Sequence, residues 1–273
     1  MKKDLSTVAI LGGGNIGLAI ANGLYNSGLF PASKITITRR HVDQLAAYQD
    51  KGFYVTADNA AAVKKSAVII LAVQPQKLNE LLSEIKSKLI PGKHILISVV
   101  SGAWIKAIKK QIGKNIPVIR AMPNTAIAIQ ESITCLASDT KKEQSLEIAE
   151  KIFSSVGKTI IIEEEMMIPA TALGACGIAF FMRAIRAASQ GGIEIGFHSE
   201  EALFIAAQTA KGAATLLLDK KNHPETEVDK VTTPRGCTIS GLNQMEHNGF
   251  SSALIKGIVT SAEKAAVLYK IDK

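Results

Sequence analysis

Residues 8–17 read VAILGGGNIG, and this stretch decides the fold of the N-terminal half. The apolar run Val8–Leu11 has the character of a strand, three glycines follow it, and the residues after them can continue as a helix. Gly12, Gly14 and Gly17 stand at the G-x-G-x-x-G spacing, which after a strand and before a helix is typical of a dinucleotide-binding turn. The first glycine permits the tight turn, the second lets the backbone approach a pyrophosphate, and the third lets helix and strand pack closely. An ordinary glycine-rich turn is the alternative. The cofactor contacts predicted here are Gly12, Gly14, Asn15, Ile16 and Gly17.

The strand predicted over Lys34–Thr38 ends in Arg39 and Arg40. In a Rossmann unit this strand end meets the adenosine ribose, where an NAD enzyme carries Asp or Glu and an arginine suits the 2′-phosphate of NADP. No acid stands between Lys34 and His41. Because a guanidinium binds phosphate as a bidentate fork, we predict NADPH as the cofactor, with NADH possible. Two plain surface charges are the alternative.

Strand-like and helix-like segments alternate as far as Ile162, which predicts an α/β fold with a doubly wound parallel sheet. The apolar run Ala67–Val73 is typical of a buried parallel strand, and it stops at the carboxyl end where cofactors lie. Another strand breaks at Pro123, where a purely structural turn is the alternative. The further cofactor contacts predicted, most of them at strand ends, are Asn59, Ala72, Val73, Pro75, Met122, Pro123 and Asn124.

After Glu163–Glu165 the pattern changes to helices alone. The stretch Ala170–Phe181 is apolar on all faces, so we expect it to be buried. These few helices alone can form only a small hydrophobic core. We therefore predict that they pair with the helices of a second subunit. We therefore predict a Rossmann domain over residues 1–165 and an all-helical dimerisation and substrate-binding domain over 166–273. The predicted helices are Pro169–Gly191, Ser199–Lys221 with Ser199 as N-cap, Thr238–His247 and Ser251–Lys270.

Bulk composition narrows the classes of partner. Of the 273 residues, 47% are hydrophobic and 21% charged, which supports a substantial core and argues against disorder. The formal net charge of +8 comes from scattered lysines with little aromatic interleaving. That distribution favours a basic surface that attracts anionic small molecules over a nucleic-acid interface.

The cysteines and the apolar runs indicate the cellular compartment in which the protein is expected. Cys135, Cys176 and Cys237 are far apart and form no C-x-x-C motif, so neither a metal site nor a disulfide framework is expected, and a reducing cytoplasm fits. The residues before the first strand leave no room for a signal peptide. No uninterrupted apolar run reaches the length of about 18 residues that spans a membrane.

A second turn of chemical interest lies between two helical stretches, at Val231–Thr238. Pro234 and Gly236 fix the turn, and Thr238 stands where the next helix begins. Free backbone amides at a helix start can bind a carboxylate, and the threonine adds a hydroxyl. An ordinary helix-capping turn is the alternative.

Segments spread over the whole chain match one family pattern: the G-x-G-x-x-G turn, Ala72-Val73-x-Pro75, Ile119–Thr125, His223-Pro224, Asp229-x-Val231, Pro234-x-Gly236-x-Thr238 and Gly249-Phe250. Through these segments the chain as a whole resembles the pyrroline-5-carboxylate reductases. The resemblance implies a Rossmann domain, an interlocked helical dimerisation domain and a homodimer or larger oligomer. It also implies the last step of proline synthesis, the reduction of a cyclic imine to L-proline by NAD(P)H.

The sequence departs from the family pattern at three places. The turn that usually reads Pro-Gly-Gly-(Thr/Ala)-Thr carries Arg235 and Cys237. The usual Ser-Gly-(Ser/Cys)-Gly-Pro-Ala-Tyr reads differently over Gly174–Phe180 and lacks the serine, proline and tyrosine. Gln74 replaces the lysine of Ala-Val-Lys-Pro.

The resemblance assigns roles at the second turn. The substrate carboxylate is expected at the amides of Gly236, Cys237 and Thr238, and Thr238 is the catalytic candidate because its hydroxyl can bond the ring nitrogen or the carboxylate. Arg235 either adds charge beside the carboxylate or points to solvent. One alternative is an NADP-binding paralogue that acts on another cyclic imine or has no catalysis. Another is a β-hydroxyacid dehydrogenase-like reductase, although that family relies on a lysine and Ala170–Arg186 contains none.

Overall fold

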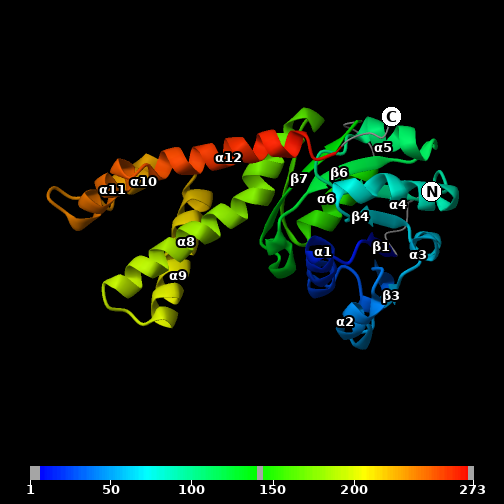
Figure 1. Ribbon diagram of the computed structural model, residues 1–273, viewed down its shortest axis with the longest axis horizontal. Coiled ribbons are helices and arrows are strands. Elements are labelled where there is room, and N and C mark those ends of the chain that lie inside the picture. The colour runs from blue at the N-terminus through cyan, green and yellow to red at the C-terminus, as the bar shows by residue number, and fades with distance from the viewer. Residues whose placement is uncertain (1–6, 140–143, 270–273) are drawn as a thin grey trace. The chain divides into compact units, whose positions relative to one another are not determined.

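The structure is a computed structural model that describes residues 7–139 and 144–269. The described chain divides into two compact units. The first holds the residues up to Cys176 and again those from Ser261, and the second holds Gly177–Thr260. Figure 1 labels the elements of both.

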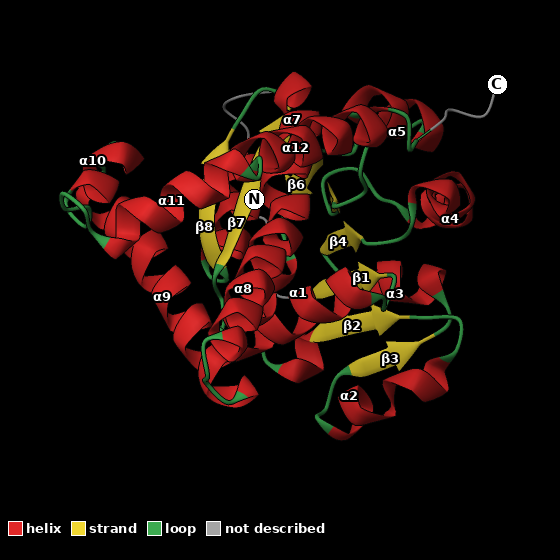
Figure 2. Ribbon diagram, turned by 60° about the vertical axis from the view of Figure 1, so that its left-hand side comes forward, coloured by secondary structure: helices red, strands yellow, loops and turns green. Residues whose placement is uncertain are grey.

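The first unit is built on one eight-stranded sheet with the order β3-β2-β1-β4-β5-β6-β7-β8 (Figure 2). Neighbouring strands are parallel except β6 and β7, which are antiparallel. The sheet is mostly parallel as predicted, and this pair is its exception: only the short 3-10 turn Thr125–Ile129 joins the two strands, and a parallel crossover needs a longer connection. The strands are β1 Val8–Leu11, β2 Ile35–Thr38, β3 Tyr54–Thr56, β4 Val68–Leu71, β5 Ile95–Ser98, β6 Val118–Met122, β7 Ser132–Ser138 and β8 Gly157–Ile161.

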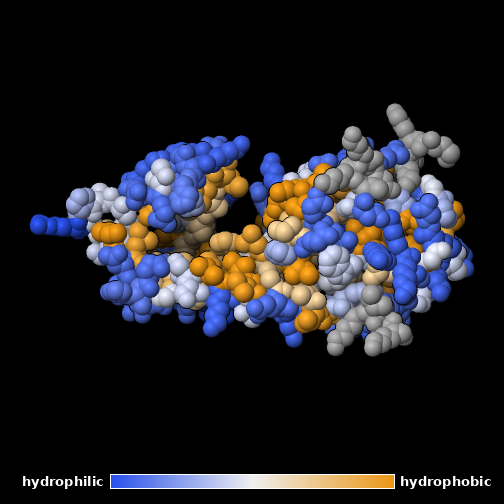
Figure 3. All heavy atoms as spheres, turned by 90° about the horizontal axis from the view of Figure 1, so that it is seen from above, coloured by the Kyte–Doolittle hydropathy of each residue, from blue (hydrophilic) through white to orange (hydrophobic). Residues whose placement is uncertain are grey.

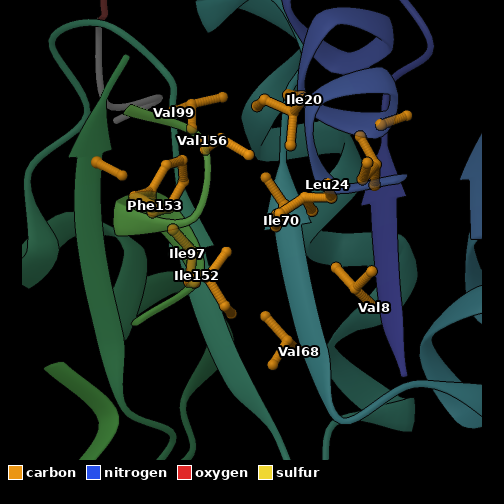
Figure 4. Packing of buried hydrophobic residues seen from close by; sticks show 14 of the residues in the cluster. Val8, Ile20, Leu24, Val68, Ile70, Ile97, Val99, Ile152, Phe153 and Val156 are labelled. Carbon is orange, nitrogen blue, oxygen red and sulfur yellow. The ribbon is translucent and has the colours of Figure 1, made fainter. Parts of the chain in front are cut away.

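Helices cover both faces of the sheet. The core on one face joins Val8 and Ile10 of β1 to the helices α1 and α6, as Figure 4 shows for Ile20, Leu24, Ile152 and Phe153. The core on the other face joins the alternate β1 residues to α3, α4 and α5. A strand covered on both sides must be apolar at every position, which explains the unbroken run in the sequence. The helices are α1 Asn15–Asn26, α2 Ala46–Asp50, α3 Asn59–Lys65, α4 Leu78–Ile85, α5 Ile105–Ile112 and α6 Gln144–Ser154.

The rest of the described chain is helical, as predicted, with some differences in detail. The N-cap of α9 is His198 rather than Ser199: His198 has extended backbone angles and forms a capping box with Glu201, so Ser199 is already the first helical residue. The short helix α10, which begins at Pro224, was not predicted. The elements are α7 Met167–Ala170, a π-helical stretch Thr171–Cys176, α8 Gly177–Glu194, α9 Ser199–Lys220, α10 Pro224–Asp229, α11 Cys237–His247 and α12 Phe250–Ala266.

Much of the apolar surface of these helices is exposed in the single chain. Leu173 and Phe181 each keep 60% of their surface exposed. The expectation that the stretch Ala170–Phe181 is buried is therefore not met in the single chain. Figure 3 shows apolar residues in orange at the surface of the helical part on its left-hand side. By length and composition alone, the helical stretch Glu164–Glu194 is long and apolar enough to cross a membrane, although no uninterrupted apolar run within it reaches 18 residues.

Candidate active site

A cavity of about 650 Å³ opens beside the carboxyl ends of β1, β2 and β4. The chain leaves β1 toward β2 on one side, and β4 lies on the other side of β1. The cavity therefore lies at the point where the strand order reverses, which is where open α/β sheets bind ligands. It brings together seven of the predicted cofactor residues, namely Gly12, Gly14, Arg39, Arg40, Asn59, Ala72 and Val73.

The three glycines of the turn have different physical roles. Gly12 has a φ of 117°, and a Cβ there would lie 2.4 Å from the carbonyl oxygen of Ala72. A Cβ on Gly17 would lie 2.0 Å from the carbonyl oxygen of Gly12, so the start of α1 packs directly against the turn. Gly14 differs, since no atom lies within 4 Å of the place of its Cβ. The first and third glycines are thus required by packing, and the second keeps a side of the cavity open.

The start of α1 offers backbone donors. Gly14 is its N-cap and provides no side-chain hydrogen bond to the first turn. The first N–H groups of an α-helix have no partner within the helix, and the helix dipole favours an anion near them. Together with the open space at Gly14, this arrangement fits a pyrophosphate.

The arginines lie at the end of β2. The Nη1 group of Arg39 donates a 2.8 Å hydrogen bond to the carbonyl oxygen of Gly13, so the guanidinium is held against the glycine turn. A guanidinium has five N–H donors, and this bond uses one of them. Arg40 and His41 follow Arg39 along the cavity wall. The cavity wall therefore carries positive charge at the end of β2, and the Arg39 guanidinium is held in place there.

A chain of hydrogen bonds that the sequence did not reveal crosses the cavity wall. The amide of Gly12 donates to Oγ1 of Thr38 at 3.2 Å, and that hydroxyl donates to Oδ1 of Asn59 at 2.6 Å. The Nδ2 group of Asn59 then donates to Oε2 of Glu84 on α4 at 2.9 Å. Glu80, one turn earlier on α4, also lines the cavity. The spacing of the two glutamates after a predicted strand end was the available signal for them.

Among the described residues, the other predicted cofactor contacts do not line this cavity; they are Asn15, Ile16, Gly17, Pro75, Met122, Pro123 and Asn124. The Asn124 side chain is engaged elsewhere, because Oδ1 accepts from the amide of Ala126 and Nδ2 donates to the carbonyl of Gly174 at 3.1 Å. This side chain ties the turn after β6 to the π-helical stretch. The Asn124 side chain thus forms structural hydrogen bonds, and its predicted contact with the cofactor stays a prediction.

The second turn lies in the helical unit. Gly236 is the N-cap of α11, and its amide donates to the carbonyl of Thr233 at 2.9 Å. A Cβ on Gly236 would lie 2.9 Å from the carbonyl oxygen of Thr233, so a larger residue there would force the turn to shift. Thr238 is exposed in the first turn of the helix. The predicted dinucleotide residues lie in the first unit, and Gly236–Thr238 lie in the second.

Arg235 adopts a left-handed backbone conformation, with a φ of 61°. A non-glycine residue costs roughly 1–2 kcal/mol in this conformation, which explains why a glycine is usual at this place in the family pattern. Arg235 is exposed, so its charge lies at the surface next to the amides of α11.

No cluster of three or more His, Cys, Asp or Glu side chains that could hold a metal ion occurs in ranges 7–139 and 144–269. The cysteines at 135, 176 and 237 are free thiols.

Two family models match the chain. The model described as pyrroline-5-carboxylate reductase dimerisation matches residues 164–268. The model described as NADP oxidoreductase, coenzyme F420-dependent, matches residues 7–102.

Curated relatives match over nearly the whole chain. Pyrroline-5-carboxylate reductase 1 of Dictyostelium discoideum is 55% identical over 98% of the chain, which spans 51% of that relative's length. Pyrroline-5-carboxylate reductase 2 of the same organism is 48% identical over 97% of the chain and 93% of the relative. The enzyme of Arabidopsis thaliana is 33% identical over 96% of the chain and 95% of the relative.

Solved structures agree on the fold. A pyrroline-5-carboxylate reductase from Coxiella burnetii has a TM-score of 0.85 and 28% identity over 98% of this chain and 100% of that chain. The Plasmodium falciparum pyrroline carboxylate reductase, solved with NADP bound, has a TM-score of 0.89 and 22% identity over 99% of this chain and 100% of that chain.

Proposed function

This chain belongs to the pyrroline-5-carboxylate reductase family, and on that premise we propose that it reduces 1-pyrroline-5-carboxylate to L-proline with NADPH, or with NADH, as the last step of proline biosynthesis. The observation that carries the proposal is the glycine-lined cavity at the switch point of the sheet, flanked by Arg39 and Arg40. A cavity of this kind suits a phosphorylated dinucleotide.

The two parts of the chain have different roles in this proposal. We assign cofactor binding to residues 1–165, and substrate binding and dimerisation to residues 166–273. The helix start offers the amides of Cys237 and Thr238 for the substrate carboxylate, and the left-handed Arg235 adds positive charge beside them. The amide of Gly236, predicted as a third donor, already donates to the carbonyl of Thr233. The strained backbone at Arg235 agrees with a functional role for this turn.

The reaction requires few catalytic groups from the protein. The bound dinucleotide supplies the hydride. A protonated cyclic imine is already a good electrophile, so no strong general base is required. The residues of the chain hold the ring in place: the α11 amides bind the carboxylate, and the Thr238 hydroxyl bonds the ring nitrogen or the carboxylate. Positioning of this kind supplies several kcal/mol, up to roughly 7–11 kcal/mol in ideal intramolecular systems.

The exposed apolar side chains of the helical unit support a homodimer or a larger oligomer of dimers. Phe181, Met182, Leu203 and Phe204 each keep half or more of their surface exposed in the single chain. Exposed large apolar side chains in such number mark an interaction site, and a second copy covers them with matching helices. The same pairing accounts for the apolar stretch 164–194 without a membrane.

Two further assignments complete the proposal. The free thiols fit a reducing compartment, and we place the enzyme in the cytoplasm. The partners are a small anionic substrate and a second copy of the chain, with no nucleic acid.

The test is NADPH consumption with 1-pyrroline-5-carboxylate, with a piperideine carboxylate as competitor. We expect turnover with the five-membered imine, and gel filtration should give a dimer or a larger species. A protein that binds NADPH but oxidises none of it with either imine would instead be a non-catalytic paralogue.

A further inference from the structure

We propose that Glu84 hydrogen-bonds the adenosine ribose of the dinucleotide and thereby sets the balance between NADH and NADPH. The inference rests on the proposed function, because it requires a dinucleotide in the cavity. It assigns a specificity-determining role to a residue of α4, far from the glycine turn in sequence.

The position of Glu84 supplies what the end of β2 lacks. Rossmann units that bind NAD carry an acid at the end of the second strand to accept from the ribose 2′-hydroxyl. Here that strand end carries Thr38, Arg39 and Arg40 and no acid. Glu84 reaches the wall of the same cavity from another helix, so a carboxylate and the two arginines face one binding space.

The hydrogen-bond chain fixes the direction of this carboxylate. Oδ1 of Asn59 accepts from Thr38 at 2.6 Å, which leaves the Nδ2 end of the amide to donate to Oε2 of Glu84 at 2.9 Å. A carboxylate has about four acceptor positions, and this bond uses one of them. Glu84 can therefore accept from a ribose hydroxyl while Asn59 holds it in place.

The two kinds of charge favour different cofactors. A carboxylate accepts from the 2′-hydroxyl of NADH and repels the 2′-phosphate of NADPH, whereas Arg39 and Arg40 attract the phosphate. Glu80, the other glutamate of the cavity wall, pairs with Nζ of Lys77 at 3.1 Å, which offsets its charge. Glu84 is bonded to a neutral amide, so its charge remains available to the cofactor.

The experiment measures dissociation constants for NADPH and NADH by isothermal titration calorimetry on Glu84→Gln and on the unmodified protein. Glutamine keeps an oxygen for Asn59 and removes the charge. We expect the preference for NADPH over NADH to rise roughly tenfold, the size of one hydrogen bond to a charged group. Glu147→Gln, an exposed position on α6, makes the same change in net charge away from the cavity and should leave the ratio unchanged.

The outcomes separate this inference from the function beneath it. An unchanged ratio in Glu84→Gln, with both dinucleotides bound by the unmodified protein, would overturn the inference alone. The same holds for an equal shift in Glu147→Gln, or for an unmodified protein that binds NADPH and has no measurable affinity for NADH. An unmodified protein that binds neither dinucleotide would overturn the proposed function and this inference together.

Discussion

The hydroxyl of Tyr269 donates a 2.7 Å hydrogen bond to Oδ1 of Asn79, across 190 residues of sequence. Tyr269 follows α12 and packs against the core formed by α3, α4 and α5. Its backbone and that of Ala265 also approach Gly102 so closely that a Cβ there would lie 3.1 Å from the carbonyl oxygen of Ala265. Since Asn79 lies on α4 beside Glu80, this hydrogen bond anchors Tyr269 to the helix that lines the cavity.

Removal of the Tyr269 hydroxyl should weaken the contact between Tyr269 and α4. We expect Tyr269→Phe to lower the free energy of unfolding by about 1 kcal/mol, the net value of one hydrogen bond. The change should appear as a fall of roughly 2–4 °C in the melting temperature. Tyr25→Phe is the matched control, because Tyr25 is an exposed ring packed on Phe53. Equal effects of the two substitutions would contradict the role given to the Asn79 bond.

A buried guanidinium lies on the central part of β6. Arg120 is only 1% exposed, and its Nη1 group lies 3.3 Å from Oε1 of Glu164. Nε and Nη2 of Arg120 have no hydrogen-bond partner among the described residues. Burial lowers the pKa of Arg120, and the neighbouring Glu164 opposes that shift. The same carboxylate oxygen accepts from the amide of Ile105 at 2.6 Å.

Breaking this pair from one side should cost more than replacing it. Glu164→Gln leaves a buried charge uncompensated, so we expect the free energy of unfolding to fall by about 3 kcal/mol. Urea denaturation measures it. The double variant Arg120→Met, Glu164→Gln removes the charge as well and should regain part of the loss. A double variant less stable than Glu164→Gln would rule out this account.

The glycines of the turn allow a contrast between folding and binding. Gly17→Ala places a methyl group in contact with backbone and should destabilise the first unit strongly. Gly14→Ala meets open space, so the melting temperature should stay near its original value. Its methyl group projects where the backbone must approach the pyrophosphate, and we expect at least about tenfold weaker NADPH binding. Unaltered NADPH affinity in Gly14→Ala would remove that glycine from the site.

His94 should make stability depend on pH. The side chain is fully buried, and its Nδ1 atom accepts from the amide of Ile90 at 2.9 Å. Burial first, and the charge of Lys93 second, lower its pKa from 6.5 to about 4. The unfolded chain therefore binds the proton more readily between these values. Stability is full above pH 6.5 and falls as the pH drops toward 4, by about 3 kcal/mol.

A titration-free variant tests this assignment. His94→Asn keeps an acceptor oxygen for the amide of Ile90 and has no proton to gain. Urea denaturation at a series of pH values from 7 to 4 should give a flatter profile for the variant, even if it is less stable throughout. A slope as steep as that of the unmodified protein would assign the acid sensitivity to other groups.

The fold could be read from the sequence where local pattern and topology rules agree. Apolar runs predicted the central strands β1, β4 and β5, because strands buried on both faces need such runs. The direction of β7 could not be read in this way, since it depends on the shortness of the turn before it. The Ser199 cap was wrong because a side chain that can cap also stands at His198, and only the backbone angles distinguish the two.

The candidate site was predictable in the parts that follow a strand end. Gly12, Arg39 and Ala72 lie on the cavity as the carboxyl-end rule requires. Glu84 follows no such rule: it reaches the cavity from α4 through a tertiary hydrogen bond to Asn59. The i, i+4 spacing of Glu80 and Glu84 puts both on one face of α4, but the spacing alone does not show that this face lines the cavity.

The hydroxyl of Thr238 offers the sharpest test of the substrate site. If the hydroxyl donates one hydrogen bond that strengthens in the transition state, Thr238→Ala should lower kcat/KM about tenfold or more. A tenfold fall corresponds to a loss of about 1.4 kcal/mol of transition-state stabilisation. Thr238→Ser is the matched control, since it keeps the hydroxyl and should retain most of the activity. Because Thr238 is exposed in the first turn of α11, neither change should alter the melting temperature by much. Full activity in the alanine variant, or equal losses in both, would show that the hydroxyl does not act on the substrate.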